Sequence, residues 1–317
     1  KGKDVYLEKP MTLTAEQAKE VYQASQQYGR IHQGGASGAS SAWCWKARQV
    51  IAEGMIGKPV WCQTSYSRNN PHGEWNWEID PNAGPEATGE DYVDWKFWLG
   101  PAKSRPWSAD RFFRFRKFWD YSGGIATDLM YHRLTPLHIA LGLGFPKRVV
   151  GTGGIWFCKE AVDTTTGQLD VREVPDTFTI NADYWAKLSV NIPSSLVNDT
   201  GVPTVIRGHK ADLYPLEGRE QRGVRIVPQG PYKKEFQEKH GQEEIVIEAE
   251  PREDHMSNFF SCMRTREQPA LNALVAYQVM CTIGMSVESY KKGRHIYFDA
   301  EKEKVTSQPF KDMVDRV

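Results

Sequence analysis

The sequence predicts a short α/β segment followed by a larger α+β domain that is built on an open, mainly antiparallel sheet. Three observations support this fold class. Strand and helix patterns alternate over residues 1–57, six strand patterns follow one another after residue 148, and two apolar helical patterns come after them. We therefore expect two domains, residues 1–57 and residues 58–317.

The first domain begins with a short apolar strand over residues 4–7. Thr14 and Gln17 have the spacing of a capping box, so a helix is expected to begin there. A second strand is expected over residues 31–33, and it leads into a turn of small residues at 34–38. A second helix, which has Trp43, Ala47, Val50 and Ile51 on one face, follows the turn. This order is typical of a doubly wound sheet, but 57 residues are too few for a complete nucleotide-binding domain.

A long irregular region over residues 67–120 separates a strand pattern at 60–66 from a helix expected at 125–141. A loop of this length inside a compact domain is usually functional. It is rich in tryptophan, whose flat apolar face suits a sugar ring, although any single ring can instead pin the loop to the core. The tryptophans in this region are Trp75, Trp77, Trp95, Trp98, Trp107 and Trp119.

The remainder of the chain reads mostly as strands that alternate apolar and polar residues. The expected strands cover residues 148–157, 176–184, 186–192, 204–213, 224–227 and 244–248. Two helices at 255–266 and 271–291 and a strand at 295–299 follow them.

Composition and charge exclude several classes of protein. The 40 basic and 40 acidic residues cancel, which gives no electrostatic indication of nucleic acid or an anionic membrane as a partner. The most apolar helical stretch, residues 271–285, is interrupted by Asn272 and Gln278 and is shorter than the roughly 20 residues that a membrane span needs.

Five cysteines lack the spacing of zinc ligands or redox pairs, so reduced and mostly buried thiols are expected at Cys44, Cys62, Cys158, Cys262 and Cys281. A cytoplasmic protein is expected, although the lack of a visible signal peptide decides nothing about the compartment. Because the sequence begins at Lys1 and not at Met, export to the periplasm stays open.

Lys9 is the first candidate for a residue that carries chemistry. Glu8-Lys9-Pro10 ends the first predicted strand, and the carboxyl ends of strands in open α/β sheets are where ligands bind. A lysine at that position can face a crevice and handle a proton. A surface ion pair within a turn is the simpler alternative, and it is favoured on the tripeptide alone.

Asp128 and His132 are the second candidates. They are four residues apart on the predicted helix, so both are expected to project from one face. A carboxylate beside an imidazole can orient the ring and stabilise its charged form, although structural pairs at this spacing are common. Pro136 cannot donate to the carbonyl of His132, so the helix should loosen there. No third ligand at suitable spacing supports a metal site.

A phosphate-binding glycine motif is missing from its expected context. The Gly142-Leu143-Gly144 segment follows a helix and not a strand, and residues 151–154 lie inside a predicted strand. Neither segment has the strand–turn–helix arrangement of a dinucleotide-binding fingerprint.

Several segments, taken in order, carry a more specific signal than any one of them alone. They are residues 2–10 (GKDVYLEKP), 94–101 (DWKFWLGP), 119–121 (WDY), 123–132 (GGIATDLMYH) and 258–265 (NFFSCMRT). Their order and spacing resemble the Gfo/Idh/MocA family of oxidoreductases over nearly the whole chain.

This resemblance implies an N-terminal Rossmann domain followed by an α/β domain with an open sheet. Residues 1–57 would then be a partial Rossmann domain that lacks its glycine fingerprint. This chain by itself is therefore expected to bind NAD(P) weakly and to be inactive alone.

The resemblance also assigns roles to residues. It implies that Lys9 lies by the nicotinamide and the substrate, with Asp128 and His132 completing a proton relay. The expected cofactor contacts are Glu8, Lys9, Pro10 and Gly34, with a cis peptide bond before Pro10. The expected substrate contacts are Tyr121, Trp95 and Arg116.

The favoured function is hydride transfer between NAD or NADP and a hydroxyl-bearing carbon of a sugar or cyclic polyol. The alternatives are an NAD-dependent glycoside hydrolase of the same fold and a non-catalytic, truncated module. Expected partners are a small sugar or polyol and further copies of the chain in a dimer or tetramer, because an open sheet face needs cover. Neither nucleic acid nor a membrane is expected as a partner.

Overall fold

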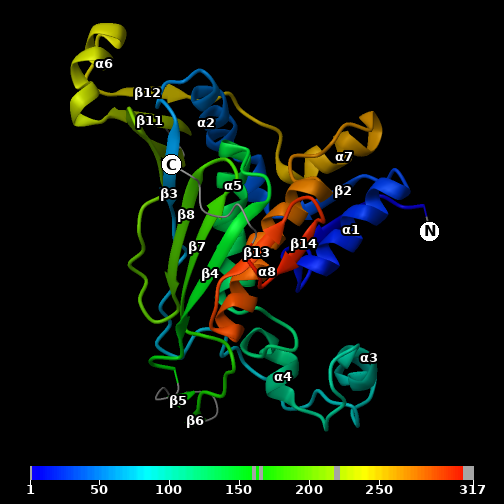
Figure 1. Ribbon diagram of the computed structural model, residues 1–317. Coiled ribbons are helices and arrows are strands. Elements are labelled where there is room, and N and C mark those ends of the chain that lie inside the picture. The colour runs from blue at the N-terminus through cyan, green and yellow to red at the C-terminus, as the bar shows by residue number, and fades with distance from the viewer. Residues whose placement is uncertain (1, 159–161, 164–166, 218–221, 310–317) are drawn as a thin grey trace.

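The computed structural model describes residues 2–158, 162–163, 167–217 and 222–309 (Figure 1). A pair of parallel strands near the N-terminus precedes a ten-stranded sheet, and the main helices pack on one face of that sheet. The predicted fold class, an α/β segment followed by a large and mainly antiparallel sheet, is confirmed.

The N-terminal part is built from β1 (Val5–Glu8), α1 (Ala15–Gln27) and β2 (His32–Gly35). The two strands pair in parallel. The predicted capping box is present, because the Thr14 hydroxyl accepts from the Gln17 N–H and the Gln17 side chain accepts from the Thr14 N–H. Helix α1 packs against α8 (Ala273–Lys292), which holds the parallel strands beside the large sheet.

The large sheet has the strand order β12-β11-β10-β9-β3-β8-β7-β4-β13-β14. Its neighbouring strands are antiparallel, except that β3 and β8 are parallel. The strands are β3 (Pro59–Gln63), β4 (Pro146–Gly154), β7 (Thr177–Tyr184), β8 (Leu188–Ser195), β9 (Val205–Gly208), β10 (Ala211–Glu217), β11 (Arg222–Pro228), β12 (Ile245–Glu248), β13 (Ile296–Asp299) and β14 (Lys304–Thr306). A separate small pair consists of β5 (Val162–Asp163) and β6 (Gln168–Leu169).

Helices and short helical turns connect these strands. The longer ones are α2 (Ala42–Ala52), α5 (Tyr131–Leu141), α6 (Lys233–His240) and α7 (His255–Thr265). The π-helical turn η4 (Ala126–Met130) leads directly into α5. The short ones are η1 (Ser37–Ser40), η2 (Gly89–Asp91), α3 (Trp95–Leu99), α4 (Ala109–Phe113), η3 (Phe115–Lys117) and η5 (Gly230–Tyr232).

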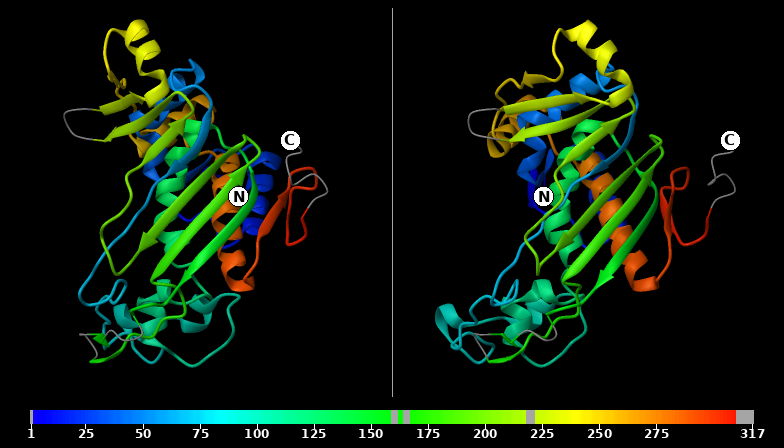
Figure 2. Two further views of the ribbon diagram at one scale, coloured as in Figure 1. Left: turned by 60° about the vertical axis from the view of Figure 1, so that its left-hand side comes forward. Right: turned by 90° about the vertical axis from the view of Figure 1, so that its left-hand side faces the viewer.

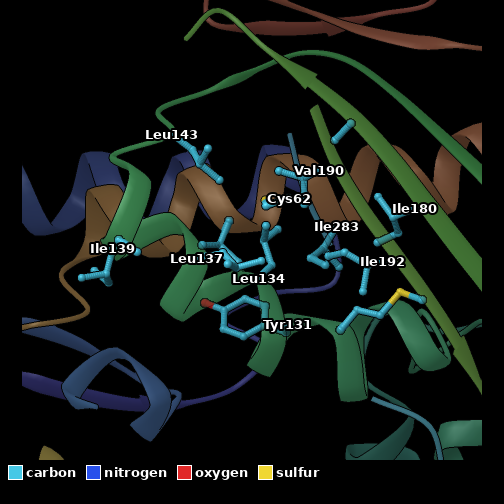
Figure 3. Close-up of a cluster of buried hydrophobic side chains, with 14 of the residues drawn as sticks. Cys62, Tyr131, Leu134, Leu137, Ile139, Leu143, Ile180, Val190, Ile192 and Ile283 are labelled. Carbon is cyan, nitrogen blue, oxygen red and sulfur yellow. The ribbon is translucent and has the colours of Figure 1, made fainter. Parts of the chain in front are cut away.

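The core lies between the sheet and helices α5 and α8, which cover one of its faces (Figure 2). Leu134 and Leu137 of α5 and Ile283 of α8 meet Ile180 and Ile192 of the sheet, and all five side chains are buried (Figure 3). Side chains alternate along β7 and β8, so their other face carries polar residues. That face is left uncovered by the helices of the same chain (Figure 2).

Buried charges hold the long loop (residues 67–120) to the sheet domain. The Lys117 ammonium donates to Asn76 Oδ1 at 3.0 Å and to Asp170 Oδ1 at 3.1 Å. The Arg172 guanidinium donates to Asp170 Oδ2 and, at 2.8 Å, to the Glu74 carbonyl. Lys117, Asp170 and Arg172 are all buried, so losing one partner leaves an uncompensated charge at a cost of roughly 3–5 kcal/mol.

The structure corrects some element boundaries. The prediction of one strand over residues 204–213 is wrong, because the chain turns at His209 and Lys210 and forms β9 and β10. This two-residue turn lacks the Asn-Gly or Asp-Gly signal from which a hairpin can be recognised. Helix α6 and strands β5, β6 and β14 were not predicted. The predicted helix over 125–141 is present, but its first turn is π-helical.

All five cysteines are free and buried, as the sequence predicts. Within the described ranges, no helix combines the length and the apolar character that crossing a membrane requires.

Candidate functional site

Lys9 leaves the end of β1 and reaches a helix that is far away in the sequence. Its ammonium donates to the Asp128 carboxylate and to the Asp128 backbone carbonyl, each at 2.8 Å. The Lys9 and Asp128 side chains are only 15% and 10% exposed, so solvent screens this ion pair little. The structure thus brings together two of the three predicted catalytic residues.

The π-helical turn η4 determines how Asp128 is presented. The Tyr131 N–H donates to the Ala126 carbonyl five residues back, which is the hydrogen bond of a π-helix. The extra residue in this turn changes the spacing between Asp128 and His132 that a regular α-helix would give. The Asp128 carboxylate accordingly accepts hydrogen bonds from Lys9 and Arg116, and not from His132.

Arg116 connects this pair to the long loop. Its Nε donates to Asp128 Oδ1 at 3.1 Å, and its guanidinium lies over the Trp77 ring at 4.9 Å. The Trp77 side chain is 45% exposed, so one aromatic face of the loop lies beside the polar cluster and stays open to solvent. The predicted substrate residue Arg116 therefore lies next to the predicted catalytic residues.

His132 is half-buried at the start of α5. Its ring meets the Tyr66 ring edge to face, with centroids 6.1 Å apart. Burial and, after it, the nearby Lys9 ammonium lower the pKa of His132 to about 4, and Asp128 offsets only part of this effect. At neutral pH the imidazole is therefore uncharged and able to accept a proton.

The Asp128 carboxylate stays ionised because the positive charges beside it outweigh the effect of burial. Burial alone would raise its pKa, but the hydrogen bond and charge of Lys9 together with the charge of Arg116 outweigh burial and hold the pKa below its usual value. The cluster thus combines a neutral base, an ammonium donor and a fixed carboxylate. We call Lys9, Arg116, Asp128 and His132 the polar cluster.

The predicted cofactor contacts lie around the ends of β1 and β2. The Lys9–Pro10 peptide bond is cis, as predicted. Glu8 is exposed and approaches Gly35, where an added Cβ would lie 2.8 Å from Glu8 Oε2. Gly34 is enclosed by its own chain, since an added Cβ would lie 2.9 Å from Leu271 Cδ2. A cofactor contact by Gly34 therefore stays a prediction.

The predicted substrate residues Trp95 and Tyr121 lie in an aromatic group that supports the long loop. The Trp95 ring stacks on Trp98 and meets Trp107, with centroids 5.0 Å apart in each case, and Trp98 contacts Tyr121 at 4.5 Å. Trp95 is buried and its Nε1 donates to the Arg105 carbonyl. Packing accounts for both residues, and their substrate contacts stay predictions.

Sequence reasoning missed Tyr66, Arg68, Trp77 and Arg133 as members of this region. Trp77 was noted only as one of the tryptophans in the loop. Arg133 follows His132 directly, and this position was the only signal that could have identified it. Among the residues that the structure describes, no group of three or more His, Cys, Asp or Glu side chains could hold a metal ion.

Comparison with known proteins shows what the chain is similar to. Residues 42–148 match the model of the oxidoreductase family, C-terminal alpha/beta domain, of the Gfo/Idh/MocA type. An uncharacterized oxidoreductase of Synechocystis sp. (strain ATCC 27184 / PCC 6803 / Kazusa) is 34% identical over 113 residues. That alignment covers 32% of this chain and 30% of the relative, so it spans less than a third of the relative's length.

Solved structures share the fold over most of this chain. An aldose-aldose oxidoreductase from Caulobacter crescentus, complexed with glycerol, superposes with a TM-score of 0.61 at 15% identity over 94% of this chain and 72% of that one. An inositol dehydrogenase homolog from Azotobacter vinelandii, complexed with NADH and myo-inositol, gives the same TM-score, identity and coverage. At this identity the likeness shows the fold alone.

We predict that replacing Lys9 by Met raises the pKa of His132 from about 4 toward the ordinary value of 6.5. The change removes a positive charge that disfavours the protonated ring and leaves Asp128 freer to favour it, so both effects act in the same direction. An NMR titration of the imidazole resonances, assigned with His132→Gln, measures this shift. The matched control is Lys19→Met on α1, where Lys19 pairs with Glu303. An unchanged or lower pKa in Lys9→Met would show that the two groups are not coupled.

Proposed function

Because residues 42–148 match the model of the C-terminal alpha/beta domain of a Gfo/Idh/MocA-type oxidoreductase family, we propose that the chain is part of an NAD(P)-dependent sugar or polyol dehydrogenase. The reaction would move a hydride between the nicotinamide and a carbon that bears a hydroxyl group. The observation that carries this proposal is the contact between Lys9, at the end of a parallel strand, and Asp128, on the π-helical turn. A purely local ion pair would not require residues so distant in sequence to meet.

Each residue of the polar cluster has a separate role in the removal of the substrate hydroxyl proton. In the oxidation direction, the Lys9 ammonium donates a hydrogen bond to the substrate hydroxyl oxygen and stabilises the negative charge that develops there. The neutral His132 imidazole accepts the hydroxyl proton as the carbon–oxygen double bond forms. Asp128 holds Lys9 in place, and Arg116 donates to the same oxygen of that carboxylate, Oδ1.

The cofactor site is proposed to use the ends of β1 and β2. Residues 2–57 carry a strand end that presents Lys9, but they contain no glycine-rich phosphate-binding motif, so we propose that they form the nicotinamide side of the site. The ammonium at the strand end fits a place where a nicotinamide and a hydroxyl group meet. NAD or NADP bound there would accept the hydride.

Trp77 is proposed as the wall on which the substrate ring lies. It is 45% exposed and contacts the polar cluster through the guanidinium of Arg116. Apolar C–H faces of sugars and cyclic polyols pack well on such a ring. The solved neighbours that hold glycerol or myo-inositol support a polyhydroxylated substrate class.

We predict that Lys9→Met lowers turnover by roughly a hundredfold or more in the full-length protein, because the donor that stabilises the developing negative charge is lost. The measurement is the rate of NAD(P)H formation with a panel of sugars and cyclic polyols. Lys19→Met removes the same charge from α1 and should retain full turnover. Unchanged turnover in Lys9→Met would rule out this role of Lys9. Hydrolysis of glycosides without net NADH formation would instead point to the NAD-dependent glycosidase.

We also propose that the protein forms a homo-oligomer through the uncovered face of the large sheet. This face is polar at Asn181 and Asn191, whose side chains hydrogen-bond to each other across β7 and β8. It also exposes Trp61, which is 39% exposed and aligned with Ser189 of β8. A broad antiparallel sheet with one open face is commonly covered by a symmetric partner.

We predict that light scattering shows dimers or tetramers and that Asn181→Lys shifts the protein toward monomers. A lysine on this face would meet its own symmetric copy or be buried without a partner, and both are unfavourable. Asn82→Lys, at an exposed position in the long loop, is the control and should leave the mass unchanged. A monomeric wild-type protein would refute the proposal.

A further inference from the structure

Tyr66 lies beside the polar cluster, and its ring is surrounded by charged side chains. The Tyr66 ring contacts His132 edge to face, and two guanidinium groups lie over it. The Arg68 and Arg133 guanidinium carbons are 5.0 Å and 5.1 Å from the ring centroid. Arg68 also donates to the Tyr66 hydroxyl at 3.1 Å. One aromatic ring therefore places two arginines beside the proposed base.

These arginines are not equally neutralised. Arg68 pairs with Glu74 at 2.9 Å. No carboxylate among the described residues forms an ion pair with Arg133, and the Arg133 Nε is buried without a hydrogen-bond partner. Buried polar groups nearly always have partners, so an orphaned guanidinium nitrogen next to a proposed base requires an explanation.

Charge is also unbalanced around His132. The basic groups are Lys9, Arg68, Arg116 and Arg133, whereas Asp128 and Glu74 are the carboxylates that pair with them. With His132 neutral, two positive charges remain without a counter-charge. Partly buried charges are screened weakly, so the surplus is felt by any ligand that approaches His132.

We propose that the substrate carries an anionic group, a carboxylate or a phosphate ester, that Arg133 and Arg68 bind beside the Tyr66 ring. Its hydroxyl-bearing carbon then lies at Lys9 and His132. This inference rests on the proposed function, since it names the substrate class for the same site. A guanidinium presents its N–H groups as a planar fork, which matches the oxygens of either anion.

The bound anion has a consequence for the reaction. Arg68 and Arg133 both lower the pKa of His132, and a negative charge held by them would offset that effect. A base works best when its pKa lies near the pH of the reaction. The anionic substrate would thus improve the base that acts on it, and a neutral sugar would not.

The test compares D-glucose, D-glucuronate and D-glucose 6-phosphate by titration calorimetry on the full-length protein, at low and at physiological salt. We expect at least one anionic sugar to bind about tenfold or more tightly than glucose, and less tightly as salt rises. Preference for glucuronate identifies a carboxylate, and preference for the phosphate identifies a phosphate ester. Arg133→Gln should weaken binding of the preferred anion by roughly 10- to 100-fold, the scale of a charged hydrogen bond.

Two further variants keep the result interpretable. Arg48→Gln removes an exposed arginine from α2 and should leave all three affinities unchanged. Arg133→Lys keeps the positive charge but removes the planar guanidinium, so it should lose only part of the affinity for the anionic sugar. It replaces Arg133→Gln in the experiment if that variant does not fold. NMR should show the pKa of His132 rising when the anionic sugar binds and staying low with glucose.

Equal affinity for the three sugars, no binding of either anionic sugar, or an unchanged affinity in Arg133→Gln would overturn the inference. Turnover separates this failure from failure of the proposed function. If neutral sugars drive NAD(P)H formation and anionic ones do not, the dehydrogenase function is supported and the anion-binding site is refuted. If the anionic sugars bind through Arg133 but no sugar drives NAD(P)H formation, the anion-binding site is supported and the proposed reaction is refuted.

Discussion

The arrangement of the site depends on one ammonium group, that of Lys9, which joins segments 119 residues apart. Lys9 comes from the end of a parallel strand, and both of its acceptors belong to Asp128 on the π-helical turn before α5. Because the pair is largely buried, Lys9 without Asp128 would be an uncompensated charge, whereas Asp128 without Lys9 would keep only Arg116 as its partner. Together with the packing of α1 on α8, the contact holds the N-terminal strands against the sheet domain, and it contributes to the charge that His132 experiences.

A second set of buried charges holds the segment of the long loop that carries Trp77. Besides the buried Trp75, the buried charges of Lys117, Asp170 and Arg172 hold the segment around Trp77 through a continuous network. Arg116 lies one residue before Lys117, so the network also places the guanidinium that bridges Trp77 and Asp128. Loop position and carboxylate position are thus coupled through adjacent residues of η3.

Most of the fold could be predicted from the sequence, because alternation in β7 and β8 and the capping box of α1 are local signals. The resemblance implied that Lys9 and Asp128 belong to one site, but the direct hydrogen bonds of Asp128 with Lys9 and Arg116 had no local signal, since the i,i+4 spacing on the predicted helix pairs Asp128 with His132. Trp95 and Tyr121 lie in motifs that resemble the family, yet packing within the loop accounts for them. Arg133 carried no pattern of its own, and its place over Tyr66 arises from tertiary structure.

A double-mutant cycle on Lys9→Met and Asp128→Asn, measured by urea unfolding, tests most directly whether this pair joins the two parts of the molecule. Each single variant should lower the free energy of unfolding, and the double variant should lose less than the sum of the two. We predict a coupling free energy of roughly 1–3 kcal/mol, the range for residues in direct contact within a charged network. Additive effects, within about 0.5 kcal/mol, would contradict the account.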